Sequence, residues 1–251
     1  MEERLNKWLS QMGVCSRREA DRLIEAGKVL VDNRPASMGQ KVTPGQKVVC
    51  NGKMVRVDRS QRPRPVLLAV NKPKGIVCTT TDKDRAENIV DFLGYPERIY
   101  PVGRLDKDSE GLLLMTNQGD LVNKIMRSGN AHEKEYIVTI DKPVTERFLE
   151  QMAGGIRLPE LDQVTRPCKV KKVERNTFSI ILTQGLNRQI RRMCEVCGCQ
   201  VKRLVRVRIM NIRLGNLRTG AYRQITKEEY EELTGLLKDS SSLSLKERKN
   251  R

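Results

Sequence analysis

The stretch that decides the fold is residues 103–116, Gly103-Arg104-Leu105-Asp106-Lys107-Asp108-Ser109-Glu110-Gly111-Leu112-Leu113-Leu114-Met115-Thr116. Its first half opens on a glycine and is rich in charge, which is typical of a loop, whereas its second half has the consecutive apolar residues of a buried strand. The pattern therefore predicts a loop that delivers Asp106 to the entrance of a buried strand. On this spacing alone, a nucleophilic carboxylate and a carboxylate that caps a turn explain Asp106 equally well.

The net charge of the chain indicates a polyanionic partner. Its 251 residues include 48 Lys and Arg against 31 Asp and Glu, a formal charge of +17. This exceeds the net charge of about 2 to 8 that suits the solubility of a small domain, so a general solubility role is the weaker explanation. Neutralisation of phosphates with release of counterions is the commonest reason for such an excess, and we therefore expect a nucleic acid partner.

Two further features indicate where the chain works. The first residues lack the apolar segment of a secretion signal, and no run approaches the ~18 consecutive apolar residues that span a membrane. The seven cysteines, spread from Cys15 to Cys199, are an odd number. Without a secretion signal they are expected to be reduced thiols. We therefore predict a cytoplasmic protein with no membrane partner.

Residues 1–57 have the pattern of a small αβ unit. Apolar residues recur at helical spacing from Leu5 to Met12, which predicts one amphipathic helix. Ser16, followed three residues later by a glutamate, predicts the capped start of a second helix. Asn51-Gly52 lies between two short apolar runs, which is a strong signal for a two-residue hairpin turn.

Residues 58–65 contain no apolar residue apart from two prolines, so they are predicted to be a linker. Residues 66–238 then alternate between strand and helix patterns, and the polar residues 239–251 are predicted to be a disordered basic tail. The expected strands are Leu67–Asn71, Leu112–Thr116, Glu135–Ile140, Val164–Val173, Thr177–Thr183 and Val201–Met210. The expected helices are Ala86–Leu93, Asp120–Met126, Thr145–Ala153, Asn187–Val196 and Thr226–Leu237. The fold class is therefore α+β, with a mixed, mostly antiparallel sheet flanked by helices.

Four segments of the larger unit together resemble the motifs of RNA pseudouridine synthases, and they occur in that family's order. They are Asn71–Gly75, which resembles the opening segment, Gly103–Asn117, which resembles the central motif, Lys134–Val138, which resembles the strand with the active-site tyrosine, and Gln184–Met193, which resembles the third motif. The N-terminal unit resembles the small RNA-binding module named after ribosomal protein S4. A module of this kind, a short linker and a synthase domain form the layout of the RsuA branch, which modifies ribosomal RNA.

The resemblance implies an isomerase that breaks the bond between a uridine base and its ribose and rejoins the sugar to C5 of the base. Asp106 would act as the nucleophile at the sugar–base unit, by attack on C1′ or by assisting loss of the base. Tyr136 would stack on the flipped uracil and Arg191 would pair with Asp106 to keep it ionised, with Arg188 and Arg192 as competitors on neighbouring helix faces. Without the resemblance, Tyr136 reads as a strand aromatic and the arginines read as a solvated basic face.

The resemblance also implies which residues contact RNA and which partners the protein has. The expected substrate is 23S ribosomal RNA of the large subunit or its precursor, with a transfer RNA as a second candidate, and the expected state is a monomer without cofactor or metal. The expected RNA contacts in the synthase unit are Arg104, Leu105, Lys107, Leu186, Asn187, Arg188 and Gln189. Those in the N-terminal unit are Arg4, Lys7, Arg17, Arg18 and Arg22.

Four alternatives compete with this interpretation. A zinc site at Cys194, Cys197 and Cys199 would need a second ligand pair, which the sequence lacks, and His132 is the one histidine. The same scarcity of histidine disfavours a catalytic triad. A non-catalytic S4-type RNA-binding or ribosome-assembly factor fits the charge but leaves the Asp106, Tyr136 and Arg191 motifs unexplained. A glycosidase with paired carboxylates explains neither the excess of cations nor the N-terminal unit.

Overall fold

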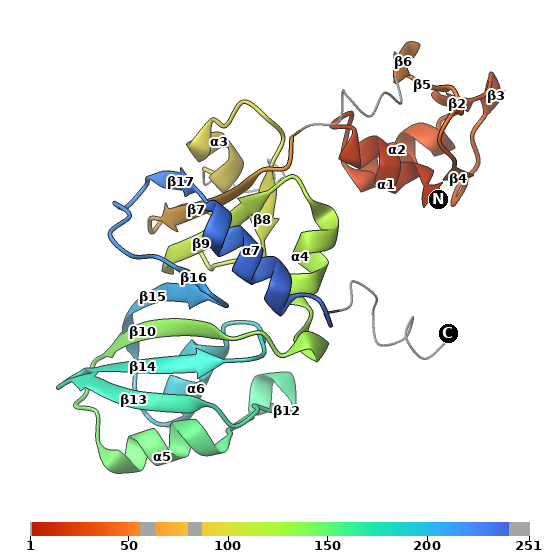
Figure 1. Ribbon diagram of the computed structural model, residues 1–251. Coiled ribbons are helices and arrows are strands. Elements are labelled where there is room, and N and C mark those ends of the chain that lie inside the picture. The colour runs from red at the N-terminus through yellow and green to blue at the C-terminus, as the bar shows by residue number, and fades with distance from the viewer. Residues whose placement is uncertain (1, 56–63, 80–86, 241–251) are drawn as a thin grey trace. The chain divides into compact units, whose positions relative to one another are not determined.

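The computed structural model describes residues 2–55, 64–79 and 87–240. The chain divides into two compact units, Met1–Pro65 with Pro96–Arg98, and Val66–Tyr95 with Ile99–Arg251 (Figure 1). Most of the predicted linker and all but the first two residues of the predicted tail lie outside the described residues. In the part of the chain that is described, no helix is both long enough and apolar enough to span a membrane.

The small unit packs two helices against short strands around one apolar core that includes Leu5, Trp8 and Leu9. Its order is β1 (Glu3–Arg4), α1 (Leu5–Gln11), α2 (Arg17–Glu25), β2 (Val29–Val31), β3 (Arg34–Pro35), β4 (Lys41–Val42), β5 (Val48–Cys50) and β6 (Lys53–Val55). The strands β3, β2, β5 and β6 form an antiparallel sheet in that order.

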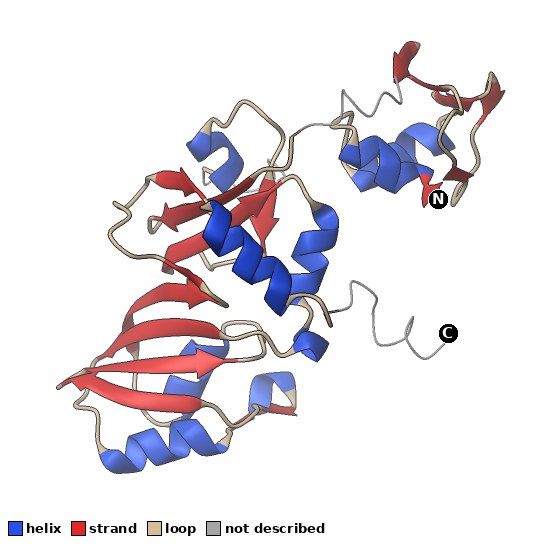
Figure 2. Ribbon diagram, viewed as in Figure 1, coloured by secondary structure: helices blue, strands red, loops and turns tan. Residues whose placement is uncertain are grey.

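The large unit is a mixed sheet with helices on it (Figure 2). Its strands are β7 (Leu67–Lys72), β8 (Tyr100–Val102), β9 (Glu110–Thr116), β10 (Lys134–Ile140), β11 (Arg157–Leu158), β12 (Gln163–Val164), β13 (Lys169–Glu174), β14 (Thr177–Leu182), β15 (Val201–Ile209), β16 (Ile212–Arg213) and β17 (Tyr222–Gln224). Its helices are α3 (Ile89–Leu93), α4 (Gly119–Met126), α5 (Glu146–Gly154), α6 (Gln189–Val196) and α7 (Lys227–Leu236). The predicted α+β class is confirmed.

Local signals in the sequence produce several of these elements directly. Ser16 Oγ accepts a hydrogen bond from the backbone N–H of Glu19 at 3.1 Å and begins α2. Thr226 and Glu229 form the full reciprocal capping box of α7. Asn51-Gly52 takes positive φ angles of 49° and 74°, as a two-residue hairpin turn requires.

The main sheet follows the order β13-β14-β10-β15-β9-β7-β17 within the described residues. Its pairs are antiparallel except β15 with β9, which are parallel. Residues alternate between two cores along β7, where Leu67 and Ala69 face the core under α4 and α7, and Leu68 and Val70 face the core on the α3 side. This strand is therefore buried on both faces, which explains its unbroken apolar sequence.

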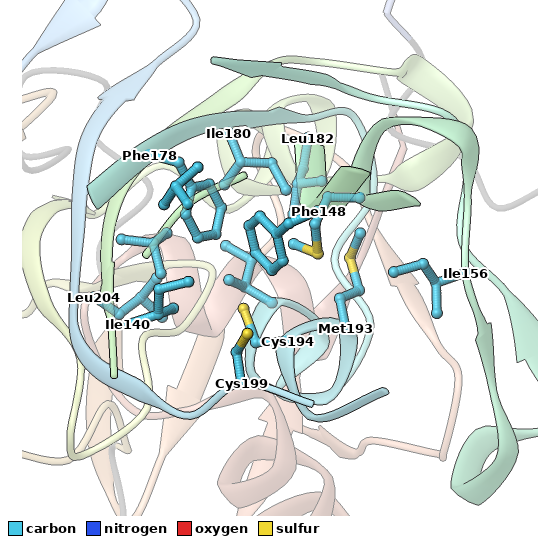
Figure 3. Close-up of a cluster of buried hydrophobic side chains, with 14 of the residues drawn as sticks. Ile140, Phe148, Ile156, Phe178, Ile180, Leu182, Met193, Cys194, Cys199 and Leu204 are labelled. Atoms are coloured by element: carbon cyan, nitrogen blue, oxygen red, sulfur yellow. The ribbon is translucent and has the colours of Figure 1, made fainter. Parts of the chain in front are cut away.

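A third core lies under the other half of the sheet. It gathers side chains from β10, β14, α5, α6 and β15, and Figure 3 shows Phe148 and Phe178 facing one another inside it. Their rings are 5.1 Å apart in an edge-on arrangement. The same core holds Met193 and Cys194 of α6. Apolar packing therefore fixes the helix that begins in the second half of the Gln184–Met193 motif.

Gly111 sets the approach of the two halves of the sheet. It is the Cα partner of Arg206 in the parallel β9–β15 pair and has a φ of 98°. A Cβ at this position would lie 2.4 Å from the backbone oxygen of Arg206. Any side chain here would therefore force β9 and β15 apart.

Three predicted elements differ from the structure. The helix expected at Ala86–Leu93 begins at Ile89, because the side chain of Asn88 caps it by accepting from the N–H groups of Val90 and Asp91. Ala86 itself lies outside the described residues.

The strand expected at Val164–Val173 is two strands, because Thr165 turns back to exchange two 2.9 Å hydrogen bonds with Ile156. The helix expected from Asn187 begins at Gln189, because Arg188 takes a left-handed conformation with φ 50° and ψ 32°. Arg188 therefore lies outside the helix that contains Arg191, whereas the sequence predicted both residues to be in one helix.

Candidate active site

A pocket of about 330 Å³ opens in the large unit beside the Asp106 loop. Five segments build it: the loop after β8, the end of α4, the start of β10, the connection from β14 into α6, and the middle of β15. The residues that line it are Gly103, Arg104, Leu105, Asp106, Ser109, Met126, Lys134, Tyr136, Leu182, Gln184, Gly185, Leu186, Asn187, Arg188, Gln189, Ile190, Arg191, Leu204 and Arg206. Asp106, Tyr136 and Arg191, which lie far apart in the sequence, thus come together at one cavity.

The loop that carries Asp106 is held through its backbone. The buried Lys72 donates from Nζ to the carbonyls of Lys107 at 3.4 Å and Ser109 at 2.8 Å. The N–H of Gly75 donates to the same Lys107 carbonyl at 2.9 Å, and the N–H of Ser109 donates to the carbonyl of Asp106 at 3.0 Å. The carboxylate is therefore presented by a fixed turn, although the Asp106 side chain is itself 37% exposed.

The nearest cation recorded for the Asp106 carboxylate is Arg188. One Nη of Arg188 lies 3.9 Å from Oδ2 of Asp106, and both side chains are partly exposed. Solvent weakens the attraction between two partly exposed groups at this distance. Arg188 has a left-handed backbone and lies just before the N-terminus of α6, outside the helix.

Arg191 makes different contacts from the predicted pairing with Asp106. Its guanidinium donates to the carbonyl of Asp108 at 3.1 Å and to the carbonyl of Val201 at 3.5 Å. Its Nε is buried and has no hydrogen-bond partner among the described residues. Arg192, the other predicted competitor, is ion-paired with Glu160. The side chains therefore give Arg188 the place that the sequence assigned to Arg191, while Arg191 lines the same pocket and supports the same loop.

Tyr136 lies on β10 between two neighbouring strands. Its Cα partners are Ile180 on β14 and Arg206 on β15. The half-buried ring packs against two of the apolar cores and lines the pocket. An aromatic face in this position can accept a base by stacking, so the predicted role of Tyr136 remains open to test.

The predicted RNA contacts of the large unit fall into two groups. Arg104, Lys107 and Asn187 are exposed, and Lys107 lies outside the set that lines the pocket. By contrast, Leu105 and Gln189 are buried, and Leu186 is half-buried. The side-chain oxygen of Gln189 accepts from the N–H of Leu186 at 3.1 Å, so this amide stabilises the turn before α6.

In the small unit, the predicted contacts Arg4, Arg17, Arg18 and Arg22 are exposed. Lys7 is half-buried and pairs with Glu3 at 3.2 Å. The exposed arginines of α2 leave a basic helix surface, and phosphates are the partner that such a surface suits.

The sequence interpretation missed three buried cations in the large unit. Lys72 has no exposed surface, Arg206 is 1% exposed and Lys134 is 5% exposed. Burial lowers the pKa of Lys72, and burial together with Arg206 lowers the pKa of Lys134 to about 8. The sequence held a signal for the burial of Arg206. It lies two residues after the apolar Leu204 in a predicted strand, and residues at this spacing share one face of the sheet.

Within the described residues, no cluster of three or more His, Cys, Asp or Glu side chains could hold a metal ion. All seven cysteines are free thiols, and each lies in the described part of the chain. Cys194 and Cys199 belong to the apolar core, and burial raises the pKa of both thiols. Their neighbour Cys197 is half-buried at the end of α6.

Comparisons with known proteins agree with these features. Residues 66–196 match the RNA pseudouridylate synthase family, and residues 3–48 match the S4 domain. The chain is 52% identical over 239 residues to the dual-specificity RNA pseudouridine synthase RluF of Escherichia coli strain K12, covering 95% of this chain and 81% of that protein. It is 36% identical to the ribosomal large subunit pseudouridine synthase B of Bacillus subtilis strain 168, covering 93% and 96%.

A solved pseudouridylate synthase structure has the same fold, with a TM-score of 0.67 at 27% identity over 92% of this chain and 99% of that one. The resemblance seen in the four sequence motifs is thereby confirmed. By its sequence, its two units and the pocket around Asp106, the chain belongs to the RNA pseudouridylate synthase family.

Proposed function

We propose that the chain isomerises a specific uridine of 23S ribosomal RNA to pseudouridine, with Asp106 as the group that acts at the sugar–base unit. The observation that supports this most is the pocket that Asp106, Tyr136, Arg188 and Arg191 line together. The relatives from E. coli and B. subtilis are named as RNA and large-subunit pseudouridine synthases. Large-subunit RNA is therefore the first substrate to test.

In the proposed reaction the target base leaves its stack and enters the pocket, which costs a few kcal/mol. Stacking on Tyr136 offsets part of this cost by roughly 1 to 3 kcal/mol. Phosphate contacts from exposed basic residues such as Arg17, Arg18 and Arg104 supply the remainder. Asp106 then attacks C1′ or assists loss of the base, and the sugar is rejoined to C5.

The direct experiment maps pseudouridine chemically across total RNA from cells with and without this protein, and then with Asp106→Asn. This variant removes the carboxylate charge at constant size, so we expect conversion to fall by at least about 10³-fold. Asp108→Asn is the matched control, because Asp108 is an exposed neighbour on the same loop. Full conversion by Asp106→Asn would refute the nucleophile assignment.

The counter-charge of Asp106 can be assigned with a second pair of variants. We propose that Arg188 is its main partner, on the 3.9 Å contact, and that Arg191 holds the loop. Arg188→Met should then lower the single-turnover rate by about tenfold or more with little change in the free energy of unfolding, because an exposed ion pair contributes only about 0 to 1 kcal/mol to stability. Arg191→Met should lower the rate together with the free energy of unfolding, because it removes hydrogen bonds to the carbonyls of Asp108 and Val201. The reverse result would restore the pairing predicted from sequence.

A transfer RNA is the second substrate class to assay, because the relative from E. coli is named a dual-specificity RNA enzyme. A non-catalytic RNA-binding factor is the alternative, and absence of any new pseudouridine in the mapping experiment would favour it. We also propose a cytoplasmic monomer. Seven free thiols suit a reducing compartment, and light scattering on the purified protein tests the oligomeric state.

A further inference from the structure

Two buried cations, Lys134 and Arg206, lie side by side in the wall of the pocket. Lys134 is two residues before Tyr136 on β10, and Arg206 is the Cα partner of Tyr136 on β15. The β10–β15 register shifts between Glu135 and Tyr136, which marks a bulge at this point. Bulges next to active sites redirect side chains, and here Arg206 lines the pocket while Arg208 pairs with Glu135.

This buried cationic pair has few partners of its own. The hydrogen bond recorded for the Lys134 ammonium is a 3.3 Å bond to the carbonyl of His132. Arg206 donates from Nε to the carbonyl of Leu112 at 2.7 Å, whereas one of its terminal nitrogens is buried without a partner among the described residues. None of the ion pairs recorded for the described residues involves either side chain.

Two like charges removed from water and close together are costly. Removing one ion from water costs several kcal/mol even after the protein relaxes, and a similar-sized apolar residue would avoid this cost. Buried charges are therefore normally paired with an anion. The pocket supplies the space for one, because both residues line its 330 Å³ cavity together with the apolar Leu182 and Leu204.

The isomerisation itself generates an anion in this cavity. When the N1–C1′ bond breaks, its electron pair stays with the base, which becomes a uracil anion with its charge spread over O2 and O4. Either C1′ bonds to Asp106, or a proton leaves C2′ and a C1′–C2′ double bond forms. C5 later bonds to C1′ as the Asp106–C1′ bond breaks, or as C2′ takes a proton back, and the C5 proton is then lost and N1 is protonated. The negative charge on the base therefore exists between cleavage and rejoining, and not before.

We propose that Lys134 and Arg206 stabilise the uracil anion that is released when the N1–C1′ bond breaks. This inference rests on the proposed function, and it adds two catalytic residues that face the base, whereas Asp106 faces the sugar. Preorganised cations that meet charge only as it develops lower the barrier without tightening substrate binding. Gln184, which is 8% exposed, lines the same pocket, and its amide nitrogen has no hydrogen-bond partner among the described residues. It is a neutral donor for a carbonyl of the same base.

Lys134→Met tests this proposal, because methionine fills a similar volume without charge. The measurement is the single-turnover rate on a large-subunit RNA transcript whose target uridine has first been mapped with the wild-type protein, together with the affinity for that RNA. We expect the rate to fall by about 10²-fold with affinity within about threefold of wild type. Lys171→Met on the exposed strand β13 is the matched control, with an unchanged rate.

A second substrate distinguishes anion stabilisation from a structural role. In a transcript with 5-fluorouridine at the target, fluorine withdraws electrons and makes the leaving base a more stable anion. Cleavage of the N1–C1′ bond is measured by nuclease digestion and mass spectrometry. The factor by which Lys134→Met slows this cleavage should be roughly tenfold smaller on the 5-fluorouridine transcript than on the uridine transcript. Arg206→Lys, which keeps the charge, should retain more activity than Arg206→Met.

Three results would overturn the proposal. They are a Lys134→Met rate within about threefold of wild type, an equal loss of rate on both transcripts, and a loss that appears in RNA affinity alone. Failure of the proposed function looks different, because the wild-type protein would then form no pseudouridine in the transcript.

Discussion

Lys72 and Lys134 are both buried lysines of the large unit, yet their surroundings differ in almost every respect. The ammonium of Lys72 donates to three carbonyls, those of Pro73, Lys107 and Ser109. Asp106, Asp108 and Glu110 all act to raise its pKa against the lowering by burial. The ammonium of Lys134 has one recorded bond, of 3.3 Å, and the neighbouring charge that acts on its pKa is Arg206, which lowers it further.

The difference shows how a buried charge can be read for its role. An ammonium has three N–H donors, and Lys72 uses all three on protein carbonyls, so its environment is complete without a ligand. Lys134 keeps unused donors and a like charge beside the pocket, so its environment is completed only by something that enters. We infer that Lys72 stabilises the fold of the catalytic loop and that Lys134 takes part in the chemistry.

The largest effect on stability should come from Lys72→Met. It leaves the buried carbonyls of Pro73 and Ser109 without the donor that Lys72 supplies, and it removes a cation among three carboxylates. We expect the free energy of unfolding to fall by about 3 kcal/mol, and the reaction rate to fall with it as the Asp106 loop loosens. Chemical denaturation at pH 7 measures the first, and single-turnover conversion the second.

Lys74→Met is the control for this change. Lys74 lies two residues away, is 51% exposed and pairs with Glu110 at 3.6 Å, so its loss should cost no more than about 1 kcal/mol. If Lys72→Met were as stable as Lys74→Met, the carbonyl contacts of Lys72 would not be what holds the loop.

Lys134→Met should change the free energy of unfolding in the opposite direction. Because the folded protein hides this charge without an anion, removing it should raise the free energy of unfolding by roughly 1 to 2 kcal/mol at pH 7, although the same variant loses activity. Denaturation of both variants under one set of conditions is the measurement. A destabilised Lys134→Met would make the two lysines alike and would remove the basis of the comparison.

The smallest effect is a dependence of this gain on pH. The folded pKa of Lys134 is about 8, below its ordinary 10.5, so between these values the unfolded chain holds a proton that the folded chain has released. The free energy of unfolding of wild type therefore rises relative to Lys134→Met as pH increases through this window. The lowered pKa of Lys72 is shared by both proteins and cancels in the difference. A gap that stayed constant from pH 7 to pH 10 would contradict a charged, buried Lys134.

Much of the fold could be predicted because its signals are local. The caps at Ser16 and Thr226, and the Asn51-Gly52 turn, depend on residues three or fewer positions apart. The strand split near Thr165 could not be predicted in this way, because its cause is hydrogen bonds to Ile156, nine residues earlier. The left-handed Arg188 has no sequence signature either, since glycine or asparagine is the residue that favours that conformation.

The residues of the candidate site also differ in whether local signals were enough to predict them. Asp106 and Tyr136 stand in short motifs and were expected at one site, and the structure places both at the pocket. The pairing of Asp106 with Arg191 was implied by the family resemblance and stays a prediction. The ion pair that the structure shows is with Arg188, whose nonhelical backbone the sequence did not indicate. Arg206 was missed because its position opposite Tyr136 depends on a strand pairing across about 70 residues of chain and on a bulge.

The contact of Gly111 with the backbone of Arg206 makes the width of the active site a matter of backbone geometry. Asp106 lies on the loop that enters β9, whereas Tyr136 and Arg206 lie on the strands beyond that contact. Gly111 therefore sets the spacing between the loop that carries Asp106 and the strand that carries Arg206. A Gly111→Ala substitution would therefore push β9 and β15 apart and widen the active site without changing any side chain that lines the pocket.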